Sequence, residues 1–217
     1  MGLLLCMCLS CAVLNIYSSE GHIRITDFGL AKGNITSESR TNSLCGTIEY
    51  MAPEIVNGSG HGKQADWWSL GVLVFEMLSG KPPFLSKNKK KLEKMIMSEK
   101  IKMPKFFSSE ASQLLKGLLN RNKNARLGAG ADGSERVKTS RFFAKINWSR
   151  LYERKVSPPY IPQVEGPDCC ANFDDHITQQ PALDSPAPTP DDTNMFHGFT
   201  YEAPSPIAAL GKRSPTK

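Results

Sequence analysis

The sequence predicts a mainly α-helical domain followed by an extended, proline-rich tail. Apolar residues recur with helical spacing in residues 69–78, 89–98 and 109–119. Past Trp148 the prolines are so frequent that no long helix or strand can form, which is typical of a segment that lies on a domain surface or stays mobile. With 217 residues, 40% of them hydrophobic, the chain can hold one domain with a core plus this tail.

Residues 1–20 form an apolar leader of uncertain origin that is free of charged side chains up to its last residue. It lacks the positive start of a secretory signal, and polar residues interrupt the apolar run that a membrane span needs. N-myristoylation of Gly2 usually requires Ser or Thr at position 6, where this chain has Cys6. We expect an artefactual or alternative start that replaces the true upstream sequence and partly continues as a buried strand. Membrane association, or palmitoylation of Cys6, Cys8 or Cys11, is the alternative.

The elements that follow the leader are predicted from their periodicity. Ile23 and Ile25 alternate with polar neighbours, which predicts a short strand at residues 21–26. A polar loop rich in Ser and Thr follows at residues 33–43. The apolar run at residues 69–78 ends before a glycine and two prolines, so it predicts a buried helix with a sharp stop.

Residues 89–98 and 109–119 are predicted to form amphipathic helices, the second with Ser109 as its N-cap. The first begins in a basic run at residues 87–91, which favours a solvated helix face over a contact with nucleic acid or an acidic membrane. Residues 128–133 are glycine-rich but lack the Lys-Ser/Thr pair of a phosphate-binding loop, and no strand leads into them. We therefore predict a surface turn there.

The net charge and the cysteines place few constraints on the function but indicate the redox environment of the protein. The formal net charge of +6 is modest and is concentrated between Lys81 and Lys155. The six cysteines show neither a disulfide framework nor paired metal-ligand spacing, which indicates cytosolic thiols. They are Cys6, Cys8, Cys11, Cys45, Cys169 and Cys170.

Three short motifs carry the chemistry of the chain. Asp27-Phe28-Gly29 follows the predicted strand, residues 52–54 read Ala-Pro-Glu, and residues 66–71 read Asp-Trp-Trp-Ser-Leu-Gly. Transfer of a phosphoryl group requires metal ions on the phosphates and a carboxylate that holds them, and Asp27 fits that role. One such motif alone is a weak signal, but in this order and spacing the three are typical of protein kinases.

On these residues the chain resembles the lower-lobe half of an AGC-group serine/threonine protein kinase, most similar to the ribosomal protein S-six kinases. The resemblance covers nearly everything from Gly21 to Pro206. It implies a partial protein kinase domain at residues 21–143, with the fold of an incomplete lower (C-terminal) lobe, and an AGC-kinase C-terminal tail at residues 144–217. The group-specific segments are Leu44-Cys45-Gly46-Thr47, Gly80-Lys81-Pro82-Pro83-Phe84, Arg126-Leu127-Gly128, Phe142-Phe143, Ile146-Asn147-Trp148, Leu183-Asp184-Ser185-Pro186 and Phe196-His197-Gly198-Phe199-Thr200-Tyr201.

The resemblance implies that Asp27 binds the magnesium of Mg–ATP, with Phe28 packed beneath it and Gly29 giving the backbone freedom to move. Asn15-Ile16 resembles the Asn-Ile pair of the kinase catalytic loop, whose Asn holds the second magnesium. Its spacing to Asp27 is one residue short of the family pattern. We interpret Asn15 as a coincidence or a splice remnant.

The resemblance also implies structural roles. Thr47 would help to set the substrate-facing loop, and Glu54 would pair with Arg126 to anchor the segment that follows Asp27. Asp66 would receive hydrogen bonds from the backbone of the catalytic loop.

Three hydroxyl groups are implied as phosphorylation sites: Ser43 in the activation loop, Ser185 in the turn motif and Thr200 in the hydrophobic motif. A phosphate on Ser43 would order its segment through basic side chains. The partners implied are a protein substrate and upstream activating kinases, without nucleic acid and without a membrane. The cytoplasm, with the nucleus as an alternative, is the location that the resemblance implies.

The sequence contains no Gly-rich loop, no strand lysine in a Val-Ala-x-Lys setting and no His-Arg-Asp, so it offers no catalytic base. Positioning and charge stabilisation supply nearly all the acceleration of phosphoryl transfer. The expected function is therefore transfer of the ATP γ-phosphate to protein Ser or Thr by family, in a truncated chain that is inactive alone. The alternative is a non-catalytic interaction or decoy module that acts through its phosphorylatable tail.

Overall fold

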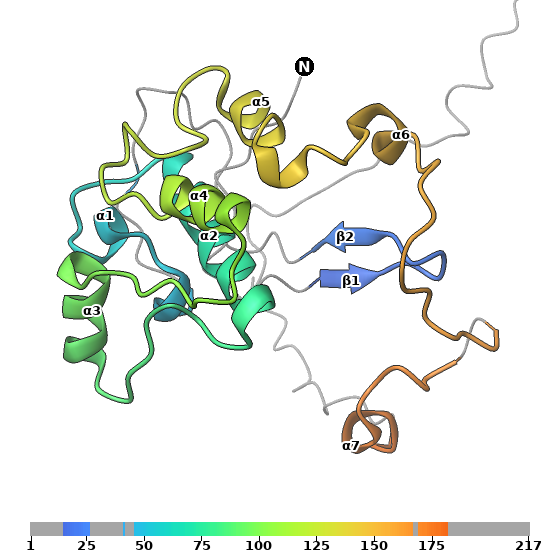
Figure 1. The fold of residues 1–217 in the computed structure, drawn as a ribbon. Coiled ribbons are helices and arrows are strands. Elements are labelled where there is room, and N and C mark those ends of the chain that lie inside the picture. The colour runs from blue at the N-terminus through green and yellow to red at the C-terminus, as the bar shows by residue number, and fades with distance from the viewer. Residues whose placement is uncertain (1–14, 27–40, 42–45, 167–168, 182–217) are drawn as a thin grey trace, which may run out of the picture. The chain divides into compact units, whose positions relative to one another are not determined.

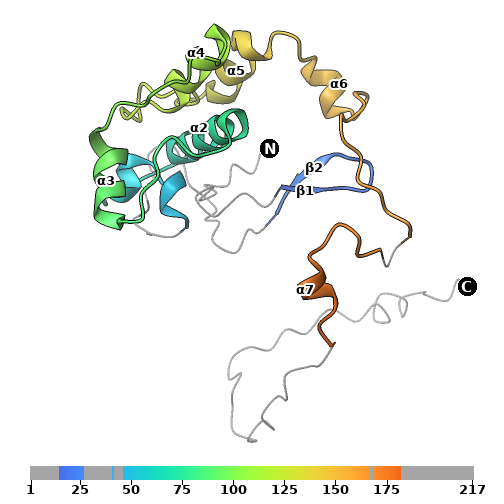
Figure 2. The same cartoon turned by 60° about the horizontal axis from the view of Figure 1, so that its bottom comes forward.

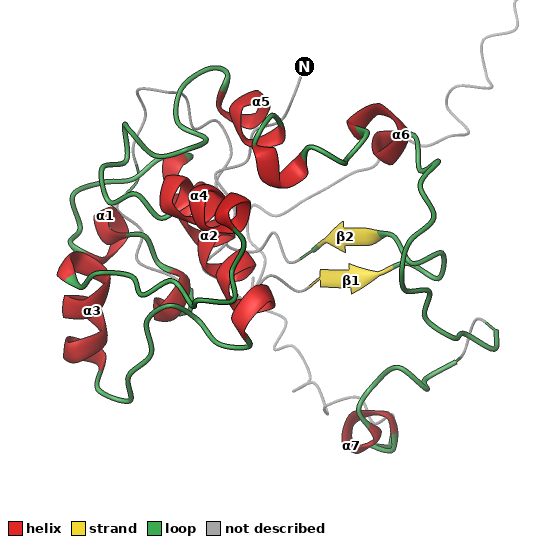
Figure 3. Ribbon diagram, in the orientation of Figure 1, coloured by secondary structure: helices red, strands yellow, loops and turns green. Residues whose placement is uncertain are grey.

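The computed structural model describes residues 15–26, 41, 46–166 and 169–181 of the chain. The chain divides into two units, residues 1–169 and residues 170–217, which are described separately. Helices dominate the first unit, and its one sheet has two short strands among the described residues (Figures 1 and 3). The predicted mainly α-helical fold is thus confirmed.

The first unit holds a hairpin, then a series of helices, most of them short. The elements in chain order are β1 (Asn15–Tyr17), β2 (Ile23–Ile25), η1 (Ile48–Tyr50), α1 (Pro53–Val56), α2 (Gln64–Ser79), α3 (Lys89–Ser98), α4 (Ser109–Leu118), α5 (Gly133–Lys138), η2 (Arg141–Phe143) and α6 (Trp148–Tyr152). In the second unit the structure describes α7 (Asp175–Thr178). None of the helices in the described ranges is long and apolar enough to cross a membrane.

The hairpin pairs β1 with β2 in antiparallel register, with Ile16 opposite Arg24. β2 forms where the alternation of isoleucines predicts a strand, whereas β1 lies within the leader. Gly21 in the connecting turn has a φ of +83°, and a Cβ there would lie 2.3 Å from the backbone oxygen of Tyr160. The turn therefore needs glycine for its backbone and for the close approach of the later chain.

That later chain, residues 154–161, passes over the turn end of the hairpin and is called the strap here. The ring of Tyr160 meets the ring of Tyr17 edge to face, with 5.4 Å between centroids. Arg154 lies 3.7 Å from the Glu20 carboxylate, an exposed pair that adds little stability. The strap shows where the proline-rich tail begins its course over the domain surface.

The core of the first unit lies between α2 and α4, which run side by side (Figure 2). Trp68 and Val72 of α2 are fully buried, and so is Leu115 of α4. Gly71 is the point of closest approach, because a Cβ there would lie 2.9 Å from side-chain atoms of Leu118 and Leu119. A larger residue at position 71 would push the two helices apart.

The helix predicted at residues 69–78 is present, but α2 begins earlier, at Gln64. Its first turn, residues 64–67, mixes the polar Gln64 and Asp66 with Ala65 and Trp67, so it does not belong to the continuous apolar run that predicts the helix. The helix ends where the sequence predicts, at Gly80, whose φ of 78° gives the left-handed cap that glycine adopts readily.

α3 spans the predicted residues 89–98, and two side chains fix its ends. At the start, the Asn88 side chain accepts a hydrogen bond from the backbone N–H of Lys91. At the end, the Arg121 guanidinium donates to the backbone oxygens of Met95, Ile96 and Glu99. Met95 and Ile96 lie in the last turn of the helix and Glu99 is its C-cap, a position where cations are favourable.

The N-cap predicted at Ser109 for α4 is wrong by one residue. The cap is Ser108, whose backbone is extended (φ −65°, ψ 162°) and whose Oγ accepts from the Ala111 N–H at 3.1 Å. Two serines stand in succession, and only the one outside the helix has the backbone geometry that turns its side chain toward the free N–H groups.

The surface turn predicted at residues 128–133 is only partly correct. Gly130 is exposed, but Gly128 and Gly133 are buried, and α5 starts at Gly133. Gly128 lies under the ring of Trp67, where a Cβ would come within 2.3 Å of the ring. The glycines here serve close packing as well as the turn.

Candidate functional site

The structure describes five of the residues that the sequence singles out: Asn15, Thr47, Glu54, Asp66 and Arg126. The other six lie outside the described residues. They are Asp27, Phe28, Gly29, Ser43, Ser185 and Thr200.

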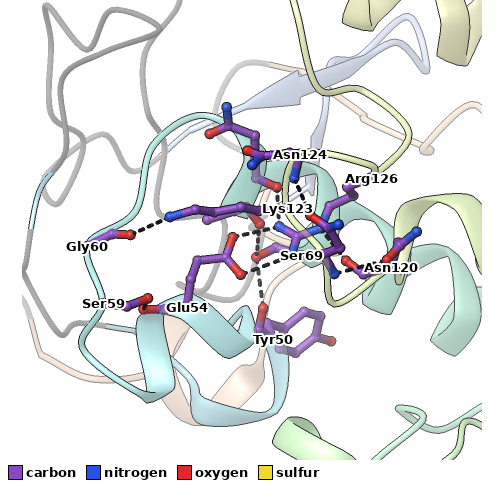
Figure 4. Close-up of polar contacts among 12 residues, drawn as sticks. Tyr50, Glu54, Ser59, Gly60, Ser69, Asn120, Lys123, Asn124 and Arg126 are labelled. Atoms are coloured by element: carbon purple, nitrogen blue, oxygen red, sulfur yellow. Dashed lines mark hydrogen bonds and ion pairs between the residues drawn. The ribbon is translucent and has the colours of Figure 1, made fainter.

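Glu54 and Arg126 form a buried ion pair, which Figure 4 shows at the centre of a polar cluster. One guanidinium nitrogen donates to Oε1 at 2.7 Å, and the other terminal nitrogen donates to Oε2 at 2.9 Å. The arginine side chain is 0% exposed and the glutamate side chain 6%. This two-point geometry is available to arginine but not to lysine, because only a planar guanidinium matches both carboxylate oxygens.

Arg126 also binds two backbone oxygens, so its donors reach three parts of the chain. Nη1 donates to the oxygen of Gln64 at 2.6 Å, and Nε donates to the oxygen of Asn120 at 2.9 Å. The guanidinium lies 5.3 Å from the ring centroid of Trp68. Burying these charges is costly, and the extra hydrogen bonds and the aromatic face offset that cost.

The local sequence places Glu54 where the pair can form. Pro53 begins α1, where its missing N–H is harmless, and the extended Ala52 precedes it. Glu54 is therefore in the first turn of a helix, a favourable position for a carboxylate. The result is that the Ala-Pro-Glu motif is fixed to the start of α2 and to the loop after α4.

Two further side chains tie this region together, and sequence reasoning did not identify them. Ser69 Oγ donates to the backbone oxygen of Tyr50 at 2.8 Å, and Lys123 Nζ donates to that of Gly60 at 3.0 Å (Figure 4). Ser69 carries a signal in hindsight, since it is a hydroxyl inside a strongly apolar helix. Lys123 carries none, because its target is a backbone group far away in the chain.

Tyr50 forms a second polar link, from its hydroxyl to the carboxylate of Glu76. Partial burial, and then the hydrogen bond and charge of Glu76, raise the pKa of Tyr50 to about 12. The phenol therefore stays protonated and keeps donating at neutral pH. This link fastens η1 to the last turn of α2.

Thr47 and Asp66 belong to the elements that carry this cluster. Thr47 is exposed and precedes η1, and its backbone oxygen accepts from the Tyr50 N–H at 3.0 Å. Asp66 lies in the first turn of α2, two residues after Gln64, whose backbone oxygen Arg126 binds. The structure thus brings Glu54, Arg126 and the helix that carries Asp66 into one region.

The hairpin places Asn15 at the end of its strand pairing that is farthest from the turn. Asn15 pairs with Ile25, and Asp27 comes two residues after Ile25. Asp27 itself lies outside the described residues, so the register of the hairpin is described only up to Ile25. This register is a feature that sequence spacing alone did not suggest.

Among the residues that the structure describes, no group of three or more His, Cys, Asp or Glu could hold a metal ion. Asp27, the residue expected to bind magnesium, is outside this set. The expectation that Asp27 binds magnesium therefore rests on the sequence motif alone.

Comparison with known proteins identifies two family models that match. The protein kinase domain matches residues 14–143, and the protein kinase C terminal domain matches residues 164–201. The first range includes Asn15, Glu54 and Arg126, and the second includes Ser185 and Thr200.

Individual relatives agree with the family models. The chain is 51% identical to serine/threonine-protein kinase AtPK2/AtPK19 of Arabidopsis thaliana, over 85% of this chain and 40% of that protein. It is 47% identical to ribosomal protein S6 kinase 2 beta of Xenopus laevis, over 92% of this chain and 32% of that protein. It is 47% identical to ribosomal protein S6 kinase alpha-2 of Homo sapiens, over 88% and 26%. The chain spans less than half the length of these relatives.

Proposed function

Because this chain belongs to the protein kinase family, within its AGC group of serine/threonine kinases, we propose that it is the activation-segment and lower-lobe part of an enzyme that transfers the ATP γ-phosphate to protein Ser or Thr. Asp27 would bind the magnesium of Mg–ATP, whereas Asn15, whose spacing to Asp27 is one residue short of the family pattern, is not assigned this role. The substrate is a protein hydroxyl.

The observation that carries this proposal is the buried Glu54–Arg126 pair. The activation segment of a kinase starts at its Asp-Phe-Gly motif and ends at its Ala-Pro-Glu motif. In this chain the second end is held by two charge-assisted hydrogen bonds at 2.7 and 2.9 Å. Such an anchor lets the segment between the motifs change its order while the rest of the lobe keeps its shape.

We test the proposed role by replacing the matching region of AtPK2/AtPK19 with residues 21–217 of this chain. With Mg–ATP and a basic serine-containing peptide, we expect the chimera to transfer phosphate. Asp27→Ala should reduce transfer to background, because the magnesium then loses its carboxylate. A folded chimera without activity, or one whose activity does not depend on Asp27, would refute the assignment.

For the 217-residue chain by itself we propose that catalysis is absent. None of its residues supplies the phosphate-binding lysine or the catalytic aspartate of a kinase. The purified chain, incubated with Mg–ATP and the same peptide, should give no turnover above that of its Asp27→Ala variant. Turnover that disappears with Asp27→Ala would contradict this part of the proposal and leave the site assignment intact.

We further propose that Ser43, Ser185 and Thr200 accept phosphate from upstream kinases. The match of the C-terminal domain family to residues 164–201 supports this for the two tail sites. Mass spectrometry of the chain isolated from cells should find phosphate at these positions. The same match supports a second candidate function, a non-catalytic module whose phosphorylated tail binds an intact AGC kinase. A phospho-Thr200 tail peptide that captures no such kinase would rule that function out.

A further inference from the structure

The surface of α3 carries a strong positive charge that the described structure does not neutralise. Between Ser86 and Lys100 the chain has six lysines and two glutamates. Of these lysines, the first five form no ion pair with any residue in the described ranges. They are Lys87, Lys89, Lys90, Lys91 and Lys94.

The position of these lysines does not favour the helix itself. Lys89, Lys90 and Lys91 occupy the first turn of α3, which has no acidic residue. Cations near the start of a helix oppose its dipole and cost about 0.3–1 kcal/mol each when exposed. The stability of α3 therefore does not explain why lysines occupy these positions. Glutamates would make an equally well solvated helix face.

A groove lies beside the lysines on the same helix. It has a volume of about 380 Å³ and is lined by Lys91, Lys94, Met95, Ser98 and Glu99. The first four stand at positions i, i+3, i+4 and i+7, so they share one face of α3. The volume is in the range of small binding sites, which run from about 300 to 1,000 Å³.

The helix that carries the groove is anchored in the core on its inner side. Leu92 and Ile96 of α3 are buried in the core, and Met95 packs against it. Asn88 caps the start of the helix, and Arg121 holds the backbone oxygens at its end. A partner would therefore meet a preformed surface, which lowers the entropy lost on binding.

We propose that this face of α3, the lysine groove, docks an acidic peptide segment of a partner protein. Carboxylates of the partner would pair with Lys91 and Lys94, and an apolar side chain next to them would lie on Met95. The charge of the groove is complementary to such a peptide. A nucleic-acid backbone fits less well, because it offers no aliphatic side chain to lie on Met95. The inference does not require catalysis, so it stands apart from the proposed kinase function.

The test is fluorescence anisotropy with the full 217-residue chain and a labelled peptide of glutamates with one central leucine. The double variant Lys91→Glu/Lys94→Glu reverses the charge of the lysine groove. The matched control is Lys100→Glu/Lys102→Glu, which changes the net charge equally at exposed positions outside the groove. We expect the groove variant to weaken binding about tenfold or more, and the control to change it less than threefold.

A second variant keeps the charge and blocks the space. Ser98→Trp places an indole in the groove at an exposed position, and it should weaken binding about fivefold or more. Replacing the leucine of the peptide with glycine should weaken binding of the wild-type chain but hardly change binding of this variant. The melting temperatures of all variants should match that of the wild type, except that Lys91→Glu/Lys94→Glu can raise it.

Three results would overturn the proposal. The peptide could fail to bind the folded wild-type chain, or the two charge reversals could weaken binding equally, which would indicate non-specific attraction only. A single-stranded RNA or phosphatidylserine vesicles could also bind tightly through Lys91 and Lys94 while the peptide does not, which would assign the face to another class of partner.

Discussion

Glu54 and Arg126 are 72 residues apart in the chain, yet two hydrogen bonds of 2.7 and 2.9 Å join their side chains in the interior of the domain. The pair connects the Ala-Pro-Glu motif to the loop that follows α4. Because both charges are removed from water, each depends on the other, and removing one partner should do more harm than removing both.

The first prediction concerns this pair. Arg126→Met leaves the Glu54 carboxylate buried without its partner, so we expect a loss of about 3–5 kcal/mol in the free energy of unfolding. The double variant Glu54→Leu/Arg126→Met should lose less than the two single variants added together. Denaturant unfolding measures all three, and Arg136→Met, at an exposed arginine in α5, is the control. Additive losses would show that the two charges do not depend on each other.

The second prediction separates packing from backbone strain in the glycine-rich segment. Gly128 and Gly130 both have a left-handed backbone, with φ values of 98° and 88°. A Cβ at Gly128 would lie 2.3 Å from the Trp67 ring, whereas a Cβ at Gly130 meets nothing within 4 Å. We expect Gly130→Ala to cost about 1 kcal/mol and Gly128→Ala about 3 kcal/mol or more. Equal losses in thermal unfolding would mean that the ring moves away at no cost.

The third prediction concerns pH. Burial and Glu76 raise the pKa of Tyr50 to about 12 from its ordinary value of 10.0. Since the folded state has the higher pKa, the stability that comes from the protonated phenol is fully present below about pH 10. It is lost as the pH rises toward about 12. The melting temperature of the wild type should therefore fall more steeply in this window than that of Tyr50→Phe. Parallel curves for the two proteins would contradict the assigned pKa.

The fourth prediction concerns the end of α3. Arg121 donates to three backbone oxygens of the last turn and lies over the ring of Phe84, 5.7 Å from its centroid. Burial lowers the pKa of this guanidinium from its usual value, in the direction that desolvation of a cation requires. Arg121→Ala should cost about 2 kcal/mol, because these oxygens lose a charged donor.

The readout for Arg121 is amide hydrogen exchange, which should accelerate in the last turn of α3 more than in α4. Arg121→Lys should recover only part of the protection, because one ammonium group cannot reach all three oxygens. Lys116→Ala removes an exposed cation from α4 and is the control. Protection that is unchanged in Arg121→Ala would mean that water replaces the guanidinium fully.

The helices show which local features could be predicted. The span of residues 89–98 was predicted correctly, because its apolar residues mark one face and Asn88 stops it from starting earlier. The start of α2 at Gln64 could not be predicted, because its first turn precedes the continuous apolar run and is held by Arg126 from another part of the chain. The cap of α4 was assigned to the wrong serine, because two candidates stand in succession and only backbone geometry distinguishes them.

The sequence by itself determined the kinase motifs, their order and the mainly helical fold, because motif spacing and apolar periodicity are properties of the chain read in one dimension. Only the tertiary structure decided that Ser69 binds Tyr50, that Lys123 binds Gly60 and that Trp67 covers Gly128. These contacts join residues that are distant in the chain. Apolar periodicity indicates which face of a helix is buried, but not which residues of other elements contact that face. The packing of α2 against α4 sets those distances, and with them the site.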